Sequence, residues 1–204
     1  MDEHVYLATR RSLHAVAELL LAGPQYRAKG TIRLRARAGG FSAVAIPVHV
    51  EGVEIVSEKG RTPLTGTCRQ LSSATGYDVG RPEGVYDDTS GVGPDDPLAV
   101  DPEAAGLLAG WFARGDAALH LLAPDLEPVL WPEHFDLAVS FEGATYGASP
   151  GDELHPLPYA YVIPPEPRQG PFWNAPFGAL RAADELPDAT SIAAFFAAAA
   201  RPAD

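Results

Sequence analysis

The spacing of apolar residues near the start of the chain predicts a helix. Apolar residues recur at Leu13, Val16 and Leu20 with charged residues between them, which is the spacing of one face of a helix over residues 5–22. Gly23-Pro24 follows directly and is a typical helix stop. The first element is therefore expected to end before Gly23.

Alternation of apolar and polar residues then predicts an antiparallel meander. Residues 31–38 and 41–50 alternate on either side of a Gly39-Gly40 turn, and Glu51-Gly52 predicts a second turn. This second turn would pair Val50 with Val53 and His49 with Glu54, so the third strand is expected to end near Val56.

The middle of the chain predicts two helices separated by a long acidic loop. Residues 65–74 favour a short helix ended by Gly76, whereas 77–102 has no periodicity and carries seven carboxylates against Arg81 alone. Asp101-Pro102-Glu103 is a strong helix start, and the helix is expected to reach about Leu122; its glycines weaken it, and Gly115-Asp116 is a point at which it could break.

The C-terminal part predicts a second group of strands. Residues 135–141 and 144–149 alternate around Glu142-Gly143, and 157–163 gives a third strand whose flanking prolines mark an edge position or a strand limit. A loop rich in proline and aromatic residues is expected over 164–187, followed by a helix capped by Asp188 or Thr190 and running to Ala200. Antiparallel groups between helices define an α+β fold, and residues 1–204 are expected to form a single domain.

Composition and charge narrow the classes of partner. The formal net charge is −12, which argues against nucleic acid and against an anionic membrane surface, so a small molecule is the favoured partner over a macromolecule. The acidic start has no export signal, and the single Cys68 is interpreted as a small buried hydrophobe. These features predict a cytoplasmic protein; they say nothing of its oligomeric state.

Two charged patterns near the start admit a functional interpretation. Arg33, Arg35 and Arg37 form a basic stripe on one face of a predicted strand, expected to face solvent or the acidic remainder of the protein, with an anionic ligand as the alternative. His14 and Glu18 lie one helical turn apart, which favours a surface pair over a role in a pocket.

Several motif-like segments lack residues that their chemistry requires. Neither lysine is followed by Ser or Thr, so there is no phosphate-binding P-loop, and the acidic loop lacks the ligand spacing of a calcium site. The GxSxG match around Ser149 is followed by Pro150, which has no N–H to contribute to an oxyanion hole.

The segment 131–177 carries the strongest candidate chemistry. It holds nine of the 18 aromatic residues and nine of the 20 prolines, together with two histidines. In an extended chain His134 and Asp136 point to one side, and a two-residue hairpin loop would bring the 150–155 loop with His155 beside them.

This cluster supports three interpretations. His134, Asp136 and His155 match a metal site with two imidazoles and one carboxylate, although the identity of any cofactor is left open and a divalent metal is one option. The same residues without metal could form an acid/base pair, or His134 and the Gly151-Asp152 turn could be purely structural. The expected substrate-binding residues around the cluster are Glu133, Tyr146, Asp152, Tyr159 and Tyr161.

Part of the C-terminal third resembles an uncharacterised family of actinobacterial proteins. The segments that carry the resemblance are Leu130-Trp131-Pro132-Glu133-His134-Phe135-Asp136 and Tyr146-Gly147-Ala148-Ser149-Pro150-Gly151-Asp152, with 158–162 after them. This resemblance implies no fold, activity, ligand or catalytic residue. The residues themselves lead to the functional hypothesis: a cytoplasmic small-molecule enzyme with a His/carboxylate cluster, such as a metal-dependent hydrolase or lyase. The alternative is a domain that binds a small molecule or another protein without turnover.

Overall fold

The computed structural model describes residues 2–199 and has the α+β fold that the sequence predicts. In chain order the elements are α1 (Glu3–Val16), the π-helical turn η1 (Ala17–Ala22), α2 (Gly23–Lys29), β1 (Leu34–Arg37), β2 (Gly40–Ala43), β3 (His49–Glu51), β4 (Glu54–Ser57), β5 (Gly60–Pro63), α3 (Cys68–Thr75), α4 (Pro102–Leu122), β6 (Val129–Trp131), β7 (Asp136–Phe141), β8 (Ala144–Ser149), β9 (Tyr159–Ile163), β10 (Ala179–Ala182), the 3₁₀ turn η2 (Ala183–Glu185) and α5 (Ala189–Ala199).

The chain divides into two compact units. The first holds the residues up to Gly110 together with Leu130–Phe135, and the second holds Trp111–Val129 and the residues from Asp136 onward. Within the first unit the strand order is β6-β1-β2-β3-β4-β5, and within the second it is β10-β9-β8-β7. All strand pairs with a described register are antiparallel. The expectation that residues 1–204 form a single domain stays a prediction.

The N-terminal helix continues past the expected stop. At η1 the backbone N–H of Gly23 donates to the carbonyl of Glu18, five residues back, and α2 then runs through Pro24 until Gly30 ends it with a φ of 72°. Proline has no N–H to donate within a helix, and its ring needs more space than a regular α turn provides. The wider π turn before Pro24 gives the ring that space. The carbonyl of Leu19 accepts instead from Gly80 N at 3.0 Å. The prediction that the helix ends at Gly23-Pro24 was wrong for this reason.

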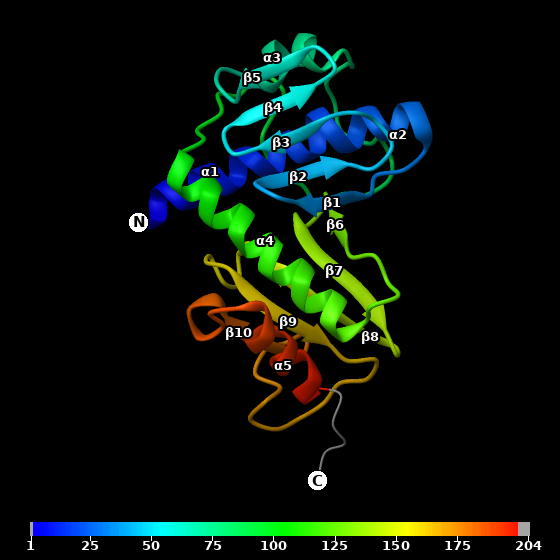
Figure 1. Cartoon of the computed structure of the whole chain (residues 1–204), viewed down its shortest axis with the longest axis vertical. Helices are drawn as coiled ribbons and strands as arrows, with labels where there is room; N and C mark the ends of the chain where they lie inside the picture. Colours follow the sequence, from blue (N-terminus) through cyan, green and yellow to red (C-terminus); the bar gives the residue numbers. More distant parts are fainter. Residues whose placement is uncertain (1, 200–204) are drawn as a thin grey trace. The chain divides into compact units, whose positions relative to one another are not determined.

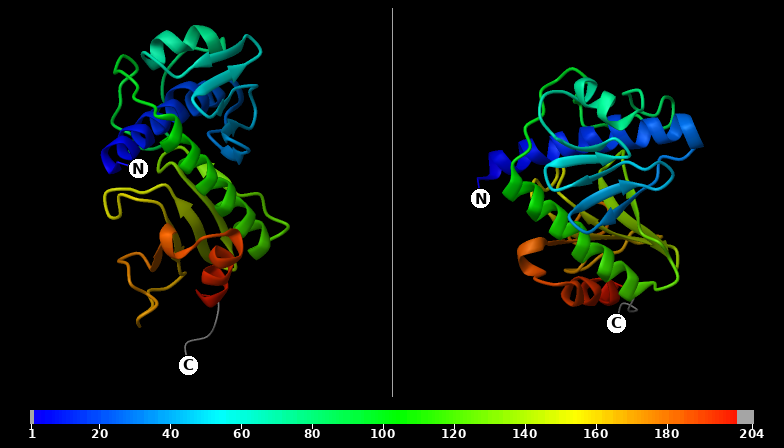
Figure 2. Two further views of the ribbon diagram at one scale, coloured as in Figure 1. Left: turned by 60° about the vertical axis from the view of Figure 1, so that its left-hand side comes forward. Right: turned by 45° about the horizontal axis from the view of Figure 1, so that its top comes forward.

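The sheet of the first unit is covered on one face by this helix (Figures 1 and 2). Phe41, Val50 and Ile55 lie opposite one another on β2, β3 and β4 and are almost fully buried, as are Leu20 and Leu21 of η1. The turn after β3 starts one residue later than predicted, so that Glu51 pairs with Glu54 and His49 with Val56. The predicted long strand over 41–50 is in fact β2 and β3, separated by residues 44–48.

The second unit packs helices on β8 and β9. Trp111 of α4 donates from its indole N–H to the carbonyl of Ser149 at 2.8 Å, and Phe196 of α5 is fully buried with its ring 5.6 Å from Tyr146. The α4 helix reaches Leu122 as predicted and runs through Gly115-Asp116 without a break. The 142–143 hairpin has the predicted register, with Phe141 opposite Ala144.

Some predicted boundaries hold and others change. Gly76 ends α3, and Asp101 caps α4 through bonds from the N–H groups of Glu103 and Ala104. The 164–187 loop contains β10 and η2, so β9 is not an edge strand, although Pro158 and Pro164 do limit it. Asp188 caps α5, and the predicted helix end at Ala200 lies outside the described residues.

Among the helices within residues 2–199, none has both the length and the apolar character needed to cross a bilayer.

Candidate functional site

Two carboxylates of the predicted cluster are bound by tyrosines within the second unit. The Tyr161 hydroxyl donates to Asp136, and the Tyr159 hydroxyl donates to Asp152. Burial, and then the neighbouring carboxylate, raise the pKa of each tyrosine. Tyr161 packs so closely over Gly147 that a Cβ there would lie 2.3 Å from its ring. These predicted site residues are therefore close together, and each of the two tyrosine hydroxyls is hydrogen-bonded to a carboxylate.

The 150–155 loop is organised by a side chain that caps its own turn. Asp152 Oδ1 accepts from the backbone N–H groups of Leu154 and His155, each at 2.8 Å. The His155 ring hydrogen-bonds to the carbonyl of Leu157 at 2.8 Å and contacts Tyr159 edge-on, with ring centroids 5.5 Å apart. Asp152 therefore has the turn-forming role that the structural interpretation assigns to it. Tyr146, also predicted to bind substrate, is buried against Phe196.

His134 and Glu133 belong to the first unit and to a different local structure. Residues 132–135 form a turn, in which Phe135 has a φ of 54° and is buried. The extended chain on which the pairing of His134 with Asp136 depended is therefore wrong. His134 Nδ1 instead lies 3.1 Å from Oδ2 of Asp88, and both side chains are exposed.

The predicted metal site requires His134, Asp136 and His155 to lie around one point. Over residues 2–199, no group of three or more His, Cys, Asp or Glu side chains is arranged to hold a metal ion. His134, Asp136 and His155 each have the separate partners described above, so their placement gives no support to the predicted metal site.

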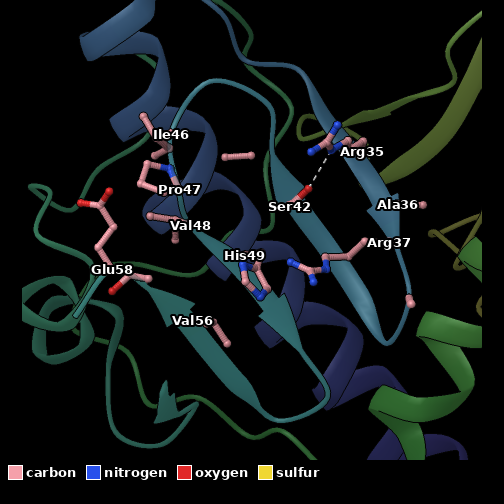
Figure 3. Close-up of a pocket in the computed structure, with 13 residues that line it drawn as sticks. Arg35, Ala36, Arg37, Ser42, Ile46, Pro47, Val48, His49, Val56 and Glu58 are labelled. Carbon is pink, nitrogen blue, oxygen red and sulfur yellow. Dashed lines mark hydrogen bonds between the residues drawn. The ribbon is translucent and has the colours of Figure 1, made fainter. Parts of the chain in front are cut away.

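The structure contains a groove that the sequence did not predict, on the outer face of the first sheet (Figure 3). Its floor is a cross-strand row in which Arg35 lies opposite Ser42, Ser42 opposite His49, and His49 opposite Val56. Arg37 lies two residues further along β1 and therefore on the same face. The groove has a volume of about 730 Å³, which is the size of a typical small-molecule site.

Apolar residues 46–48, in the connection between β2 and β3, form one end of the groove, and the buried Gln25 of α2 fixes this connection. The amide oxygen of Gln25 accepts from the backbone N–H groups of Val44 at 2.7 Å and Ala45 at 2.6 Å. Its amide nitrogen donates to the carbonyls of Thr31 and Arg33 at the approach to β1. The Gln25 side chain thus holds both the connection that forms the apolar end of the groove and the residues that lead into β1. These bonds pre-organise the groove.

The electrostatics of the groove favour an anion. In the part of the chain that the structure describes, neither Arg35 nor Arg37 has a carboxylate within ion-pair distance; Arg35 donates to Ser42 Oγ at 3.2 Å, and Arg37 extends toward His49 (Figure 3). Partial burial, and then the charge of Arg37, lower the pKa of His49, so its ring is neutral at pH 7. The carboxylate among the lining residues is Glu58, on the opposite side of the apolar end.

A signal for this groove was present in the sequence. The alternation of Arg33, Arg35 and Arg37 predicts a basic stripe on one face of a strand, which the structure confirms for Arg35 and Arg37, and an anionic ligand is the alternative interpretation of that stripe. His49 and Gln25 were not identified, because the register error at the second turn and the early helix stop misplaced both.

Comparisons of the chain with protein-family models, with curated proteins and with solved structures found no match. The resemblance to an actinobacterial family stays a prediction, and the functional argument below depends on the geometry of the chain itself.

Proposed function

We propose that this protein binds a small organic anion, a carboxylate or a phosphate ester, in the groove on the outer face of β1–β4. The observation that carries the proposal is the pair of groove arginines, Arg35 and Arg37, neither of which has a carboxylate within ion-pair distance among residues 2–199. The pKa of the more distant Glu51 is lowered first by the hydrogen bond and charge of Arg61, and then by the charge of Arg37. Arg35 uses only its Nε, which donates to Ser42, so the terminal nitrogens of both guanidinium groups are available for a ligand. The planar fork of arginine matches carboxylate and phosphate oxygens.

The remaining lining residues suggest the form of the ligand. Ser42 and the neutral His49 add hydrogen-bonding groups beside the arginines, while Ile46, Pro47 and Val48 offer apolar surface next to them. An anion with an apolar part would contact both regions. The predicted acid/base enzyme around His134, Asp136 and His155 stays a prediction, because no contact between described residues favours it over binding.

The test compares benzoate and phenyl phosphate with neutral benzamide, which matches benzoate in shape. Isothermal titration and backbone amide NMR shifts should show binding of both anions, with the shifts concentrated in residues 35–58, and much weaker binding of benzamide. Arg37→Gln should weaken binding by about tenfold or more, because a hydrogen bond to a charged group contributes on the order of 1.5–3 kcal/mol.

Arg33→Gln is the matched control. It removes the same charge from the same stripe, but Arg33 lies over the ring of Trp131, 5.9 Å from its centroid, and is not part of the groove lining. Equal binding of benzamide and benzoate, or equal losses in the Arg33 and Arg37 variants, would contradict the proposal.

A further inference from the structure

A second candidate site lies in the first unit, where helix α1 passes into η1. Glu18 is fully buried on this helix, and one of its carboxylate oxygens is well bound. That oxygen, Oε2, accepts from Ser90 Oγ at 2.6 Å, Ser90 N at 3.1 Å and Arg81 Nε at 3.3 Å. The other oxygen, Oε1, is buried and has no hydrogen-bond partner among the described residues. The expectation that Glu18 forms a surface pair with His14 was therefore wrong.

The turn at residues 132–134 brings a second such atom to the same helix. His14, one helical turn before Glu18, bonds through Nε2 to the carbonyl of Pro132 at 2.7 Å. The next residue, Glu133, has a buried Oε2 for which the described part of the chain provides no hydrogen-bond partner. The contact of His134 with Asp88 then closes this turn onto the long acidic loop.

The acidic loop supplies the third atom. The hydroxyl of Tyr86 is buried and, within residues 2–199, makes no hydrogen bond. Along the loop, Tyr86 stands between the segment that meets the 132–134 turn at Asp88 and the segment that meets Glu18 at Arg81. Burial, followed by the negative charges of Glu18 and Glu133, raises the pKa of this phenol, as expected of a hydroxyl near both carboxylates.

The loop is held in place on both sides of this cluster. Arg11 donates to the carbonyls of Ser90 and Gly91, and Arg27 donates to those of Asp78, Gly80 and Arg81. These contacts fasten the start and the end of the segment to α1 and α2. The loop backbone on either side of Tyr86 is thus docked on these helices.

Three buried oxygen atoms without partners are unusual, because the large majority of buried polar atoms in proteins are hydrogen-bonded. Arg81 forms an ion pair with Glu18, whereas Glu133 has no ion-pair partner among residues 2–199, so a cation would balance its charge. The lysines of the chain do not supply it: Lys29 is exposed, and Lys59 donates to the carbonyl of Ser73.

We propose that Glu18 Oε1, Tyr86 Oη and Glu133 Oε2 bind a primary ammonium group. Such a group has three N–H donors and one positive charge, and it matches three acceptors that carry a net negative charge. This site is separate from the anion groove and does not depend on it.

The test compares methylammonium chloride with tetramethylammonium chloride at equal ionic strength. Both ions carry one positive charge, but tetramethylammonium has no N–H donor. Binding to the folded state alone raises the melting temperature, so methylammonium should raise it by more than tetramethylammonium does. Amide NMR shifts should be concentrated at residues 14–18, 86–90 and 132–134.

Two variants separate specific binding from a general salt effect. Glu133→Gln keeps the shape and removes the charge, and Tyr86→Phe removes the hydroxyl; each should lower the apparent affinity for methylammonium by about tenfold or more. Glu83→Gln, which changes an exposed carboxylate of the same loop, is the control and should leave the response unchanged.

Equal melting temperatures in the two salts would show that water, and not an ammonium group, satisfies these atoms, and this would overturn the proposal. An unchanged methylammonium response in Glu133→Gln would overturn it as well. The folding of Tyr86→Phe is checked by its far-UV spectrum, and the Glu133 variant decides the point if the Tyr86 variant does not fold.

Discussion

His14 is a buried histidine whose surroundings disfavour its charged form. Its ring stacks on Phe135 with centroids 5.3 Å apart and bonds to the carbonyl of Pro132. Burial lowers the pKa of His14 from 6.5 to about 4. The unfolded chain therefore binds a proton at a higher pH than the folded chain does, and protonation favours unfolding in the interval between the two pKa values.

This shift predicts a loss of stability in mild acid. The contribution of His14 is fully present above pH 6.5 and is lost as the pH falls toward 4, which amounts to about 2 kcal/mol by pH 4.5. Urea unfolding of the parent and of His14→Gln at pH 7 and pH 4.5 measures it. The variant should lose about 2 kcal/mol less than the parent over this interval.

The parent and the variant have to be compared because the pKa of Glu18 shifts in the opposite direction to that of His14. Burial raises the pKa of Glu18, against the hydrogen bonds from Ser90 and the charge of Arg81, so its contribution to stability falls as the pH rises. This second group affects parent and variant alike. Parallel pH dependences in the two proteins would contradict the role assigned to His14.

The sequence indicates the local role of some residues but not the distant residues that they contact. The sequence correctly indicated that Cys68 is buried, and of the interpretations left open for Asp152 the turn-forming one matches the hydrogen bonds of the structure. It could not indicate that Glu18 is buried, because its partners Arg81 and Ser90 lie more than sixty residues away along the chain. Spacing within one helix reports which residues share a face, but not what that face meets.

At the scale of elements, two glycines of α4 should respond in opposite ways to the same substitution. A Cβ at Gly106 would meet no atom within 4 Å, whereas a Cβ at Gly115 would lie 2.5 Å from Cβ of Ala148 on β8. Alanine is favoured over glycine in a helix by about 1 kcal/mol. Gly106→Ala should therefore stabilise the protein by up to about that amount.

Gly115→Ala carries the same gain in helix propensity, but it forces the helix away from β8. Overpacking of this kind typically costs about 1–3 kcal/mol, so this variant should be the less stable of the two and less stable than the parent. Thermal and urea unfolding measure both differences. A stabilised Gly115→Ala would show that α4 and β8 are more loosely packed than the structure indicates.

The strands differ in how well their sequences predict them. The β7–β8 hairpin has clear alternation on both sides of Glu142-Gly143, and its register follows from the two-residue loop. By contrast, β5 and β10 were missed, because Gly60–Pro63 and Ala179–Ala182 are too short and too poor in β-branched residues to show a period. Pairing with a neighbouring strand, rather than local propensity, defines these two elements.

At the scale of the whole molecule, net charge and local charge have different meanings. The −12 total correctly describes an acidic protein, yet the groove between β1 and β4 has arginines as its principal charged groups. The fold concentrates on one sheet face the positive charge that the sequence spreads over residues 33–37. Composition therefore argues against polyanions such as nucleic acid while leaving room for a small anion.

We expect the two units to unfold together because of the way the chain connects them. The chain passes between them three times, and the first passage falls inside α4, after Gly110. Unfolding of one unit alone would break a 21-residue helix in its interior and separate the 130–135 segment from its neighbours in the chain. Helix formation is itself cooperative, so we expect a single transition.

The measurement uses one destabilising substitution in the core of each unit. Leu20→Ala removes a fully buried side chain from the first unit, and Phe196→Leu truncates one in the second. Loss of buried apolar atoms should cost about 2–5 kcal/mol for Leu20→Ala and less for Phe196→Leu. In calorimetry each variant should shift one transition as a whole, with a calorimetric enthalpy equal to the van't Hoff enthalpy. Two transitions, each lowered by only one of the substitutions, would show instead that the units unfold separately, and residues 1–204 would then comprise two domains.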